Sequence, residues 1–137
     1  MGEQGGAVGA APPPFFSAKP FPNVKKDILG QIGAVLLPLE KLKQKSPRGR
    51  AFEQEIHDFL LTNFNGYTVS SGNISGHWKD DQQRDHYGEH REYKVALPHG
   101  ESAATLEVFL AELAREMGEE CIYLETSREI FLVYRTT

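Results

Sequence analysis

The chain has 137 residues, of which 39% are apolar and 25% are charged, and this size and composition are typical of one globular domain. Its single cysteine, Cys121, excludes an intramolecular disulfide and any zinc site built on a pair of cysteines. Lysine and arginine total 15 against 19 aspartates and glutamates, so the formal net charge is -4 and we do not expect nucleic acid as a partner.

No stretch of the sequence approaches the roughly 20 consecutive apolar residues that a membrane span needs. The first thirty residues also lack the charged-then-apolar pattern of a secretory signal. We therefore expect a soluble, cytoplasmic protein with no membrane partner.

The N-terminal segment, residues 1–23, is rich in Gly, Ala and Pro. Proline removes backbone donors and keeps the residue before it out of the helical region, so we predict a disordered arm here. Three phenylalanines in this arm could dock on a partner or on the protein's own core: Phe15, Phe16 and Phe21. Residues 24–137 are predicted to form a single α+β domain.

Residues 28–39 fit two interpretations. Their apolar residues recur at helical spacing behind Asp27, but Gly30 and Gly33 weaken a helix, and an apolar run that ends at Pro38 is typical of a buried strand. We favour the strand.

Two amphipathic helices follow more clearly. The first is predicted to begin at Ser46-Pro47, a cap followed by proline at the first helical position, and to stop at Asn65-Gly66. The second is predicted to begin near Ser102 and to end at Gly118. Each has one apolar face, lined by Phe52, Ile56, Phe59 and Leu60 in the first helix and by Leu106, Phe109, Leu110, Leu113 and Met117 in the second.

Alternating apolar residues predict strands on which both helices pack. One run starts at Tyr67 and continues past Gly72 to Trp78, and another spans residues 93–97. The polar residues 79–88 between them are predicted to be a hairpin connection. Residues 121–124 and 130–134 form either a terminal hairpin or one bulged strand.

This order of elements predicts an α+β, ferredoxin-like βαββαβ fold with an antiparallel sheet and both helices on one face. The other face of such a sheet is bare. We expect a second copy to cover it, which makes the protein a homodimer.

Short motifs resemble those of an uncharacterised bacterial family of small domains. They are the strand Asn65-Gly66-Tyr67-Thr68-Val69, the segment Gly76-His77-Trp78 and the strand from Glu89 to Val95, with the amphipathic helix before them. Family members show a Gly-Tyr/Leu-Thr-Val strand, a Gly-x-Trp and a Glu-x-(Ser)-Lys strand. The resemblance covers residues 28–134 and implies a ferredoxin-like frame of the α/β-barrel type. The segment from Arg91 to Lys94 departs from the Ser-Lys element, and the resemblance implies no activity.

Chemically active side chains are densest between residues 77 and 92. Imidazole and carboxylate are ligands that zinc, nickel, iron and manganese accept. On a strand, His86 and His90 point to the same side about 13 Å apart, too far to share an ion unless the chain turns at Gly88. His77 and His90 could instead face each other across the hairpin. The segment holds His77, His86 and His90, the carboxylates of Asp80, Asp81, Asp85, Glu89 and Glu92, and the bases Lys79, Arg84 and Arg91.

Three interpretations of this segment stay open: a solvated loop, a ligand or catalytic pocket, and a metal site at His77 and His90. Trp78 is either a core anchor or the wall of a pocket whose rim is His77 and Asp80. We predict no cofactor, with a divalent metal as the alternative. The catalytic candidates are His77, His86, His90 and Asp80, and the ligand-binding candidates are Trp78, Tyr93 and Arg91.

Other motifs give weaker evidence of function. Residues 70–73 are predicted to be a glycine bulge, because no helix follows to make them a phosphate cradle. The basic residues between Lys41 and Arg50 are predicted to be a solvated connector, with an RNA or anion contact as the alternative. No nucleophile elbow, Walker loop, nicotinamide fingerprint or zincin helix is present.

The sequence therefore predicts a non-enzymatic binding or assembly module that presents its sheet face or polar hairpin to a protein or small-ligand partner. The alternative is a small enzyme that uses histidine and carboxylate acid-base chemistry, or a metal, at the 77–92 hairpin.

Overall fold

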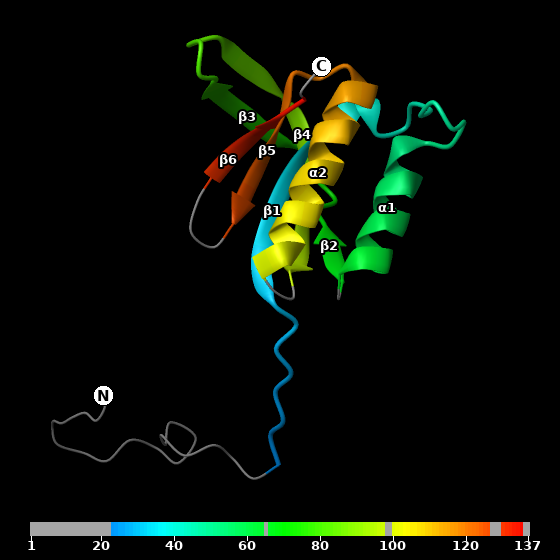
Figure 1. The fold of residues 1–137 in the computed structure, drawn as a ribbon, viewed down its shortest axis with the longest axis vertical. Helices are drawn as coiled ribbons and strands as arrows, with labels where there is room; N and C mark the ends of the chain where they lie inside the picture. Colours follow the sequence, from blue (N-terminus) through cyan, green and yellow to red (C-terminus); the bar gives the residue numbers. More distant parts are fainter. Residues whose placement is uncertain (1–22, 65, 98–99, 127–129, 136–137) are drawn as a thin grey trace, which may run out of the picture.

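A computed structural model describes residues 23–64, 66–97, 100–126 and 130–135 (Figure 1). The predicted arm over residues 1–23 lies outside this part of the chain, apart from Asn23. In chain order the elements are β1 (Gln31–Pro38), the short 3-10 helix η2 (Leu39–Lys41), α1 (Phe52–Asn63), β2 (Tyr67–Val69), β3 (Ile74–Lys79), β4 (Asp85–Leu97), α2 (Gly100–Met117), β5 (Cys121–Thr126) and β6 (Ile130–Tyr134).

The strands form one antiparallel sheet in the order β2-β4-β1-β5-β6, with β3 paired to β4. The long strand β4 pairs with β1 along one edge and with β2 and β3 in succession along the other. The α+β class is confirmed. The predicted six-element order is not the observed one, because the described chain adds β3 and β6.

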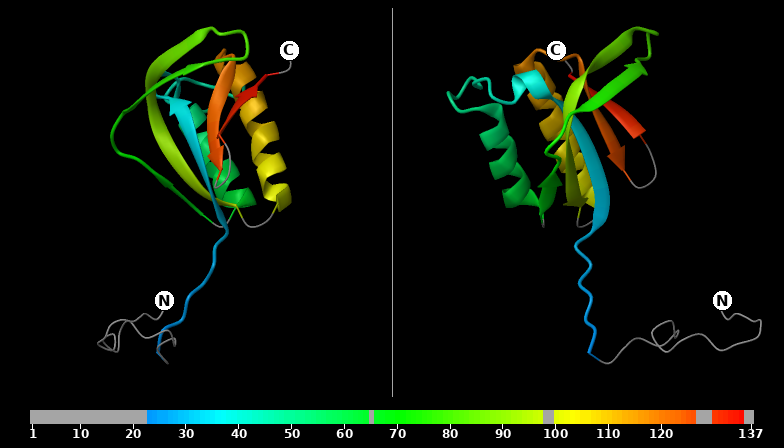
Figure 2. Two further views of the ribbon diagram at one scale, coloured as in Figure 1. Left: turned by 90° about the vertical axis from the view of Figure 1, so that its left-hand side faces the viewer. Right: turned by 180° about the vertical axis from the view of Figure 1, so that it is seen from behind.

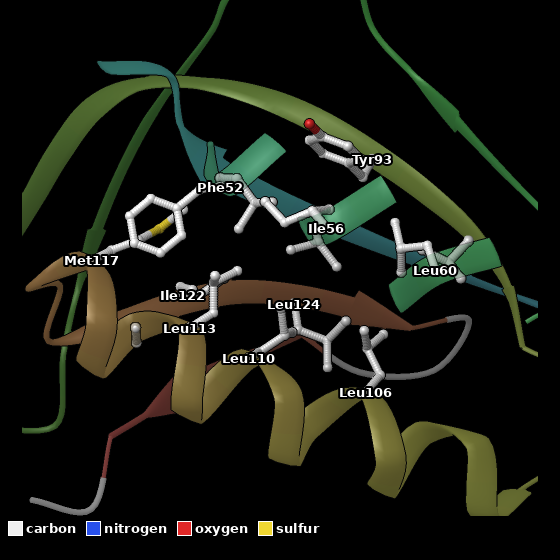
Figure 3. Close-up of a cluster of buried hydrophobic side chains, with 14 of the residues drawn as sticks. Phe52, Ile56, Leu60, Tyr93, Leu106, Leu110, Leu113, Met117, Ile122 and Leu124 are labelled. Atoms are coloured by element: carbon white, nitrogen blue, oxygen red, sulfur yellow. The ribbon is translucent and has the colours of Figure 1, made fainter. Parts of the chain in front are cut away.

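One hydrophobic core lies between the two helices and the sheet, and both helices lie on the same side of the sheet (Figures 2 and 3). Side chains alternate between the two faces along a strand. The odd-numbered residues of β1 and β4 and the even-numbered residues of β5 point to the side of the helices. The core includes Val35 and Leu37 of β1, Phe52, Ile56 and Leu60 of α1, Tyr93, Val95 and Leu97 of β4, Leu106, Leu110, Leu113, Ala114 and Met117 of α2, and Ile122 and Leu124 of β5.

Several predicted elements are confirmed. Residues 31–38 form a strand, as favoured over a helix. The sequence left open whether residues 121–124 and 130–134 form a hairpin or one bulged strand, and β5 and β6 pair as two antiparallel strands. The second helix ends at Met117, and Gly118 follows with a φ of 74°, a left-handed conformation that glycine adopts without strain.

The predicted start of the first helix is wrong. Ser46 and Pro47 precede a loop in which Gly49 has a φ of 86°, and the helix begins only at Phe52. The Ser46 hydroxyl does not cap the helix; it accepts a hydrogen bond from the Arg48 amide at 3.1 Å and donates one to Glu55 at 2.8 Å.

The run from Tyr67 to Trp78 is also two strands rather than one bulged strand. Strand β2 ends at Val69, where its pairing with β4 ends. Residues 70–73 connect it to β3, which pairs with a different part of β4. Ser70 holds this connection, because its hydroxyl accepts a hydrogen bond from the Glu92 amide at 3.0 Å.

The basic segment before α1 makes ion pairs within the domain. Arg48 joins the two helices, since its guanidinium donates to Glu55 of α1 at 2.7 Å and to Glu116 of α2 at 2.5 Å. Lys41, Lys43 and Arg50 pair with Glu119, Glu53 and Asp58, respectively. No described helix has the length and apolarity that crossing a bilayer would require.

Candidate functional site

The outer half of β4 and all of β3 form a hairpin that extends past β1 (Figure 1). Strand β1 pairs with residues 90–97 of β4, so residues 85–89 pair with β3 alone. The hairpin turns back over the sheet face that the helices leave uncovered, which we call the open face. The Trp78 ring of β3 consequently lies 5.1 Å from the Tyr123 ring of β5, measured between centroids.

A pair of opposed glycines makes this turn back possible. Gly76 of β3 is directly opposite Gly88 of β4, on the same hairpin face as Trp78 and His90. The six-membered ring of Trp78 packs against Gly76, where an added Cβ would stand 2.1 Å from its Cζ3 atom. His90 lies over Gly88, and the two rings are 5.2 Å apart. Glycine is therefore required at position 76 for the packing of Trp78.

The hairpin and the open face enclose a cavity of about 190 Å³, which we call the hairpin pocket. Aromatic rings and polar groups from β3, β4 and β5 dominate its walls. Its lining residues are Leu36, Pro38, Trp78, Asp85, His86, Tyr87, His90, Glu119, Cys121, Ile122 and Tyr123.

Two buried nitrogens of the hairpin pocket have no strong hydrogen-bond partner among the described residues: one has none, and the other has only the weak acceptor Sγ of Cys121. They are Nε1 of Trp78 and Nδ1 of His90, whose residue is 8% exposed. A buried polar atom left unpaired costs about 1–3 kcal/mol, and native proteins leave few of them. These two atoms mark the pocket as a place where a ligand can supply the missing partners.

Asp80 organises the loop at the end of the hairpin. Its side chain is fully buried, and its Oδ1 accepts hydrogen bonds from the amides of Gln82 and Arg84 at 2.8 and 3.0 Å. Its Oδ2 accepts from Nε of Arg84 at 2.9 Å and lies 3.0 Å from Nε2 of His86.

Burial by itself would raise the pKa of Asp80. The hydrogen bonds from His86 and the two amides, together with the Arg84 charge, outweigh burial and hold that pKa well below its usual range. Asp80 therefore stays ionised at neutral pH, and it fixes one ring nitrogen of His86, whose side chain also lines the pocket.

The same loop also contacts residues at β5 and β6. Arg84 forms an ion pair with Glu120, the residue before β5, and the Asp81 amide donates to the Tyr134 hydroxyl of β6 at 3.4 Å. These contacts hold the hairpin down over the open face.

Asp80, His86 and Glu120 each offer one potential metal-ligand atom, and these atoms lie within 4.8 Å of one another. Carboxylate and imidazole suit a divalent cation. However, the Arg84 guanidinium already binds both carboxylates and neutralises part of their charge. A divalent ion would have to displace Arg84, so we assign this cluster to holding the hairpin in place.

Cys121 lines the pocket but lacks the features of a nucleophile. Burial, with the nearby carboxylates of Glu120 and Asp80, raises the pKa of its thiol to about 11, despite a weak hydrogen bond from the Trp78 indole that lowers it. No described base is within hydrogen-bond distance of this sulfur. The thiol therefore stays protonated at neutral pH.

The structure separates the predicted site residues. His77 is opposite Tyr87 and His90 is opposite Ile74, so the two histidines point to opposite faces of the hairpin and the predicted pairing across it is wrong. His77 is exposed, with its side chain 64% accessible, and does not line the pocket. Gly88 lies within the regular strand β4 and makes no turn.

Asp80, His86, His90 and Trp78 do come together around the hairpin pocket. The solvated-loop interpretation is wrong for Asp80, which is 3% exposed. Tyr93 and Arg91 lie elsewhere. Tyr93 belongs to the hydrophobic core, and both residues line a separate depression beside α1.

Sequence reasoning missed Gly76, Tyr123 and Glu120 as parts of the site. A signal for Gly76 was present, because a glycine two residues before a tryptophan in a strand leaves room for the ring on the same face. Tyr123 and Glu120 are distant in sequence and join the site only through the curvature of the hairpin, which no local pattern predicts.

No protein-family model matches the chain, and no curated protein matches its sequence. Among solved structures, a phage SAM lyase in complex with S-methyl-5′-thioadenosine has a similar backbone, with a TM-score of 0.49 at 8% sequence identity. The similarity covers 82% of this chain and 96% of that one.

Proposed function

We propose that this protein is a binding module that takes one small ligand in the hairpin pocket. The observation that carries the proposal is a pair of buried nitrogens in residues that line one cavity: Nδ1 of His90, which has no partner among the described residues, and Nε1 of Trp78, which has only the weak acceptor Sγ of Cys121. A ligand that pairs both atoms recovers free energy that the unliganded protein loses.

The pocket chemistry restricts the ligand. An indole N–H only donates, so the ligand must present an acceptor to Trp78. The rings of Trp78, His90 and Tyr123 favour a planar body. The carboxylates in the lining, Asp85 and Glu119, are paired with Lys79 and Lys41, and no described lysine or arginine lines the pocket to bind an anion. A cavity of 190 Å³ compares with the roughly 150 Å³ that holds a benzene molecule. The ligand is thus a neutral, one-ring amide or nitrogen heterocycle.

Trp78 is the single tryptophan of the chain, so its indole N–H gives one unambiguous resonance in a ¹H–¹⁵N spectrum. We expect nicotinamide to move this resonance downfield in a saturable way, with a dissociation constant in about the millimolar range for so small a ligand. Nicotinate has the same ring with a carboxylate, and it should bind more weakly because no lysine or arginine of the described chain lines the pocket to pair with that charge.

Two matched variants test the role of the ring nitrogen. His90→Phe keeps a ring on the hairpin face that lines the pocket but removes Nδ1. It should weaken nicotinamide binding about fivefold or more. His77→Phe makes the same change on the opposite face of the hairpin, away from the pocket, and should leave binding unchanged. An indole resonance that nicotinamide does not move, or equal binding by His90→Phe and the unaltered protein, contradicts the proposal.

A second candidate function is acid-base catalysis in the same pocket, and the 3.0 Å contact between Asp80 and His86 favours it. A carboxylate that fixes one ring nitrogen of a histidine leaves the other free to exchange a proton with a bound molecule. NMR of nicotinamide incubated with the protein separates the two functions. Hydrolysis to nicotinate and ammonia that stops in His86→Ala supports catalysis, whereas an unchanged amide supports a binding module.

We also infer that the domain is an elaborated ferredoxin-like fold. Without β3 and β6, the remaining elements follow the order βαββαβ. Two exposed apolar side chains on the open face, Ile32 and Ile130, support assembly into a homodimer through this face. Sedimentation that gives a monomer across micromolar concentrations would remove the dimer from this account.

A further inference from the structure

A second depression lies on the helix side of the sheet, between the first turns of α1 and the strands β2 and β4. Its volume is about 690 Å³, within the usual range of roughly 300–1,000 Å³ for small-molecule sites. The side chains of Tyr67, Val69 and Tyr93 contribute an aromatic and aliphatic wall. We call this depression the α1 pocket.

The charges of the α1 pocket do not cancel. Its lining holds three bases, Lys43, Arg50 and Arg91, and two carboxylates, Glu53 and Asp58. Lys43 pairs with Glu53 at 3.5 Å and Arg50 pairs with Asp58 at 2.6 Å. One positive charge, on Arg91, is therefore in excess.

Arg91 is half-buried, and its Nε is a buried donor without a partner among the described residues. No described carboxylate is within ion-pair distance of its guanidinium. The guanidinium is close enough to Tyr93 for its charge to act on that hydroxyl. A planar fork of N–H donors with no acceptor is suited to a carboxylate, which it binds through two parallel hydrogen bonds.

The lining holds two further polar groups in a fixed arrangement, His57 of α1 and Tyr67 of β2. Nδ1 of His57 lies 2.6 Å from the Tyr67 hydroxyl, and the two rings meet edge to face. These groups can orient the part of a ligand that extends away from Arg91. Val69 remains 45% exposed and offers apolar contact to the same ligand.

We propose that the α1 pocket binds a small organic carboxylate with an aromatic or apolar body, and that Arg91 is the residue that recognises the carboxylate. This site is separate from the hairpin pocket, because Arg91 is on the helix side of β4 and His90 is on the open face. The two ligands differ in charge, so each site can be tested without the other.

Benzoate is the probe, and benzamide is its neutral counterpart. In ¹⁵N-labelled protein, benzoate should shift the Nε–H resonance of Arg91, which is assigned by its loss in Arg91→Lys. The Trp78 indole resonance reports the hairpin pocket in the same spectra and checks that each variant is folded.

Arg91→Gln should weaken benzoate binding about tenfold or more, because it removes both the charge and the fork. Arg91→Lys keeps the charge without the fork and should bind with intermediate affinity. Lys94→Gln is the matched control: it removes one charge from the same strand, on the exposed opposite face, and should stay within about twofold of the unaltered protein.

Three results would overturn the proposal. They are an Arg91 resonance that benzoate does not move, benzamide that shifts the Arg91 resonance with the same affinity as benzoate, and equal weakening by Arg91→Gln and Lys94→Gln. If Arg91→Gln fails to fold, Arg91→Lys decides: affinity equal to that of the unaltered protein would refute the role of the fork.

Discussion

Replacing Gly76 with alanine tests the packing on which the hairpin pocket depends. The new Cβ would stand 2.1 Å from Cζ3 and 2.7 Å from Cη2 of the Trp78 ring, and both distances are shorter than real contacts allow. The ring cannot simply tilt away, since His90 and Tyr123 lie against it with centroid distances of 5.2 and 5.1 Å. Trp78 must therefore leave its place in the pocket wall.

The expected loss follows from this geometry. Overpacking a well-filled site by one methyl group costs about 1–3 kcal/mol. Gly88→Ala should cost less, because its Cβ would be 3.3 Å from the edge of His90, a contact that a small shift relieves. Gly72→Ala has open space around the new methyl and should change stability by less than about 0.5 kcal/mol.

Urea unfolding followed by circular dichroism measures this series. With a slope of about 1–2 kcal/mol per molar urea, Gly76→Ala should lower the midpoint by about 1 M. Its indole ¹H–¹⁵N resonance should also move, while that of Gly72→Ala stays in place. If Gly76→Ala is as stable as Gly72→Ala and its indole resonance is unmoved, Trp78 does not lie over Gly76 and the pocket is not formed as described.

Three further predictions concern charges and the thiol. Because the pKa of Asp80 is lowered by folding, its stabilising contribution is complete above about pH 4 and is lost as the pH falls through its folded-state pKa. The free energy of unfolding, measured in urea, should therefore fall less steeply with acid in Asp80→Asn than in the unaltered protein. An equal acid loss in both proteins contradicts this. Cys121, with its pKa raised to about 11, should react with a disulfide reagent about a hundredfold more slowly in the folded protein than in urea, and equal rates would refute its burial. Arg48→Gln removes the ion-pair partner of two largely buried carboxylates, Glu55 and Glu116. It should destabilise the protein more than Arg50→Gln, which breaks an exposed pair and should cost less than about 0.5 kcal/mol. Equal losses of stability in urea would exclude the bridge between the helices.

Much of the fold could be predicted because it depends on local periodicity. The stripe from Leu106 to Met117 has the spacing of a one-sided helix, and Gly118 supplies the left-handed residue that ends it. The start of α1 could not be predicted in this way. Ser46-Pro47 has the residues of a helix cap, but its hydroxyl bonds to Arg48 and Glu55, a choice made by tertiary contacts.

The candidate site was predictable in composition but not in geometry. Strand alternation alone places His77 and Trp78 on opposite faces, which removes His77 from the pocket. The burial of Asp80 depends on Arg84 and the loop amides, and its link to β5 depends on Glu120, 40 positions along the chain. Hydrophilic residues in a loop normally indicate solvent exposure, and here three hydrogen-bond donors from the loop itself replace the water.

The most direct test of the central claim is the nuclear Overhauser spectrum of the Trp78 indole. Because the hairpin folds back over the open face, the indole protons should show cross-peaks to the Tyr123 ring of β5 and to the Cys121 side chain. An indole that shows cross-peaks only within its own hairpin would place β3 away from β5. In that case there would be no enclosed cavity and no hairpin-pocket ligand.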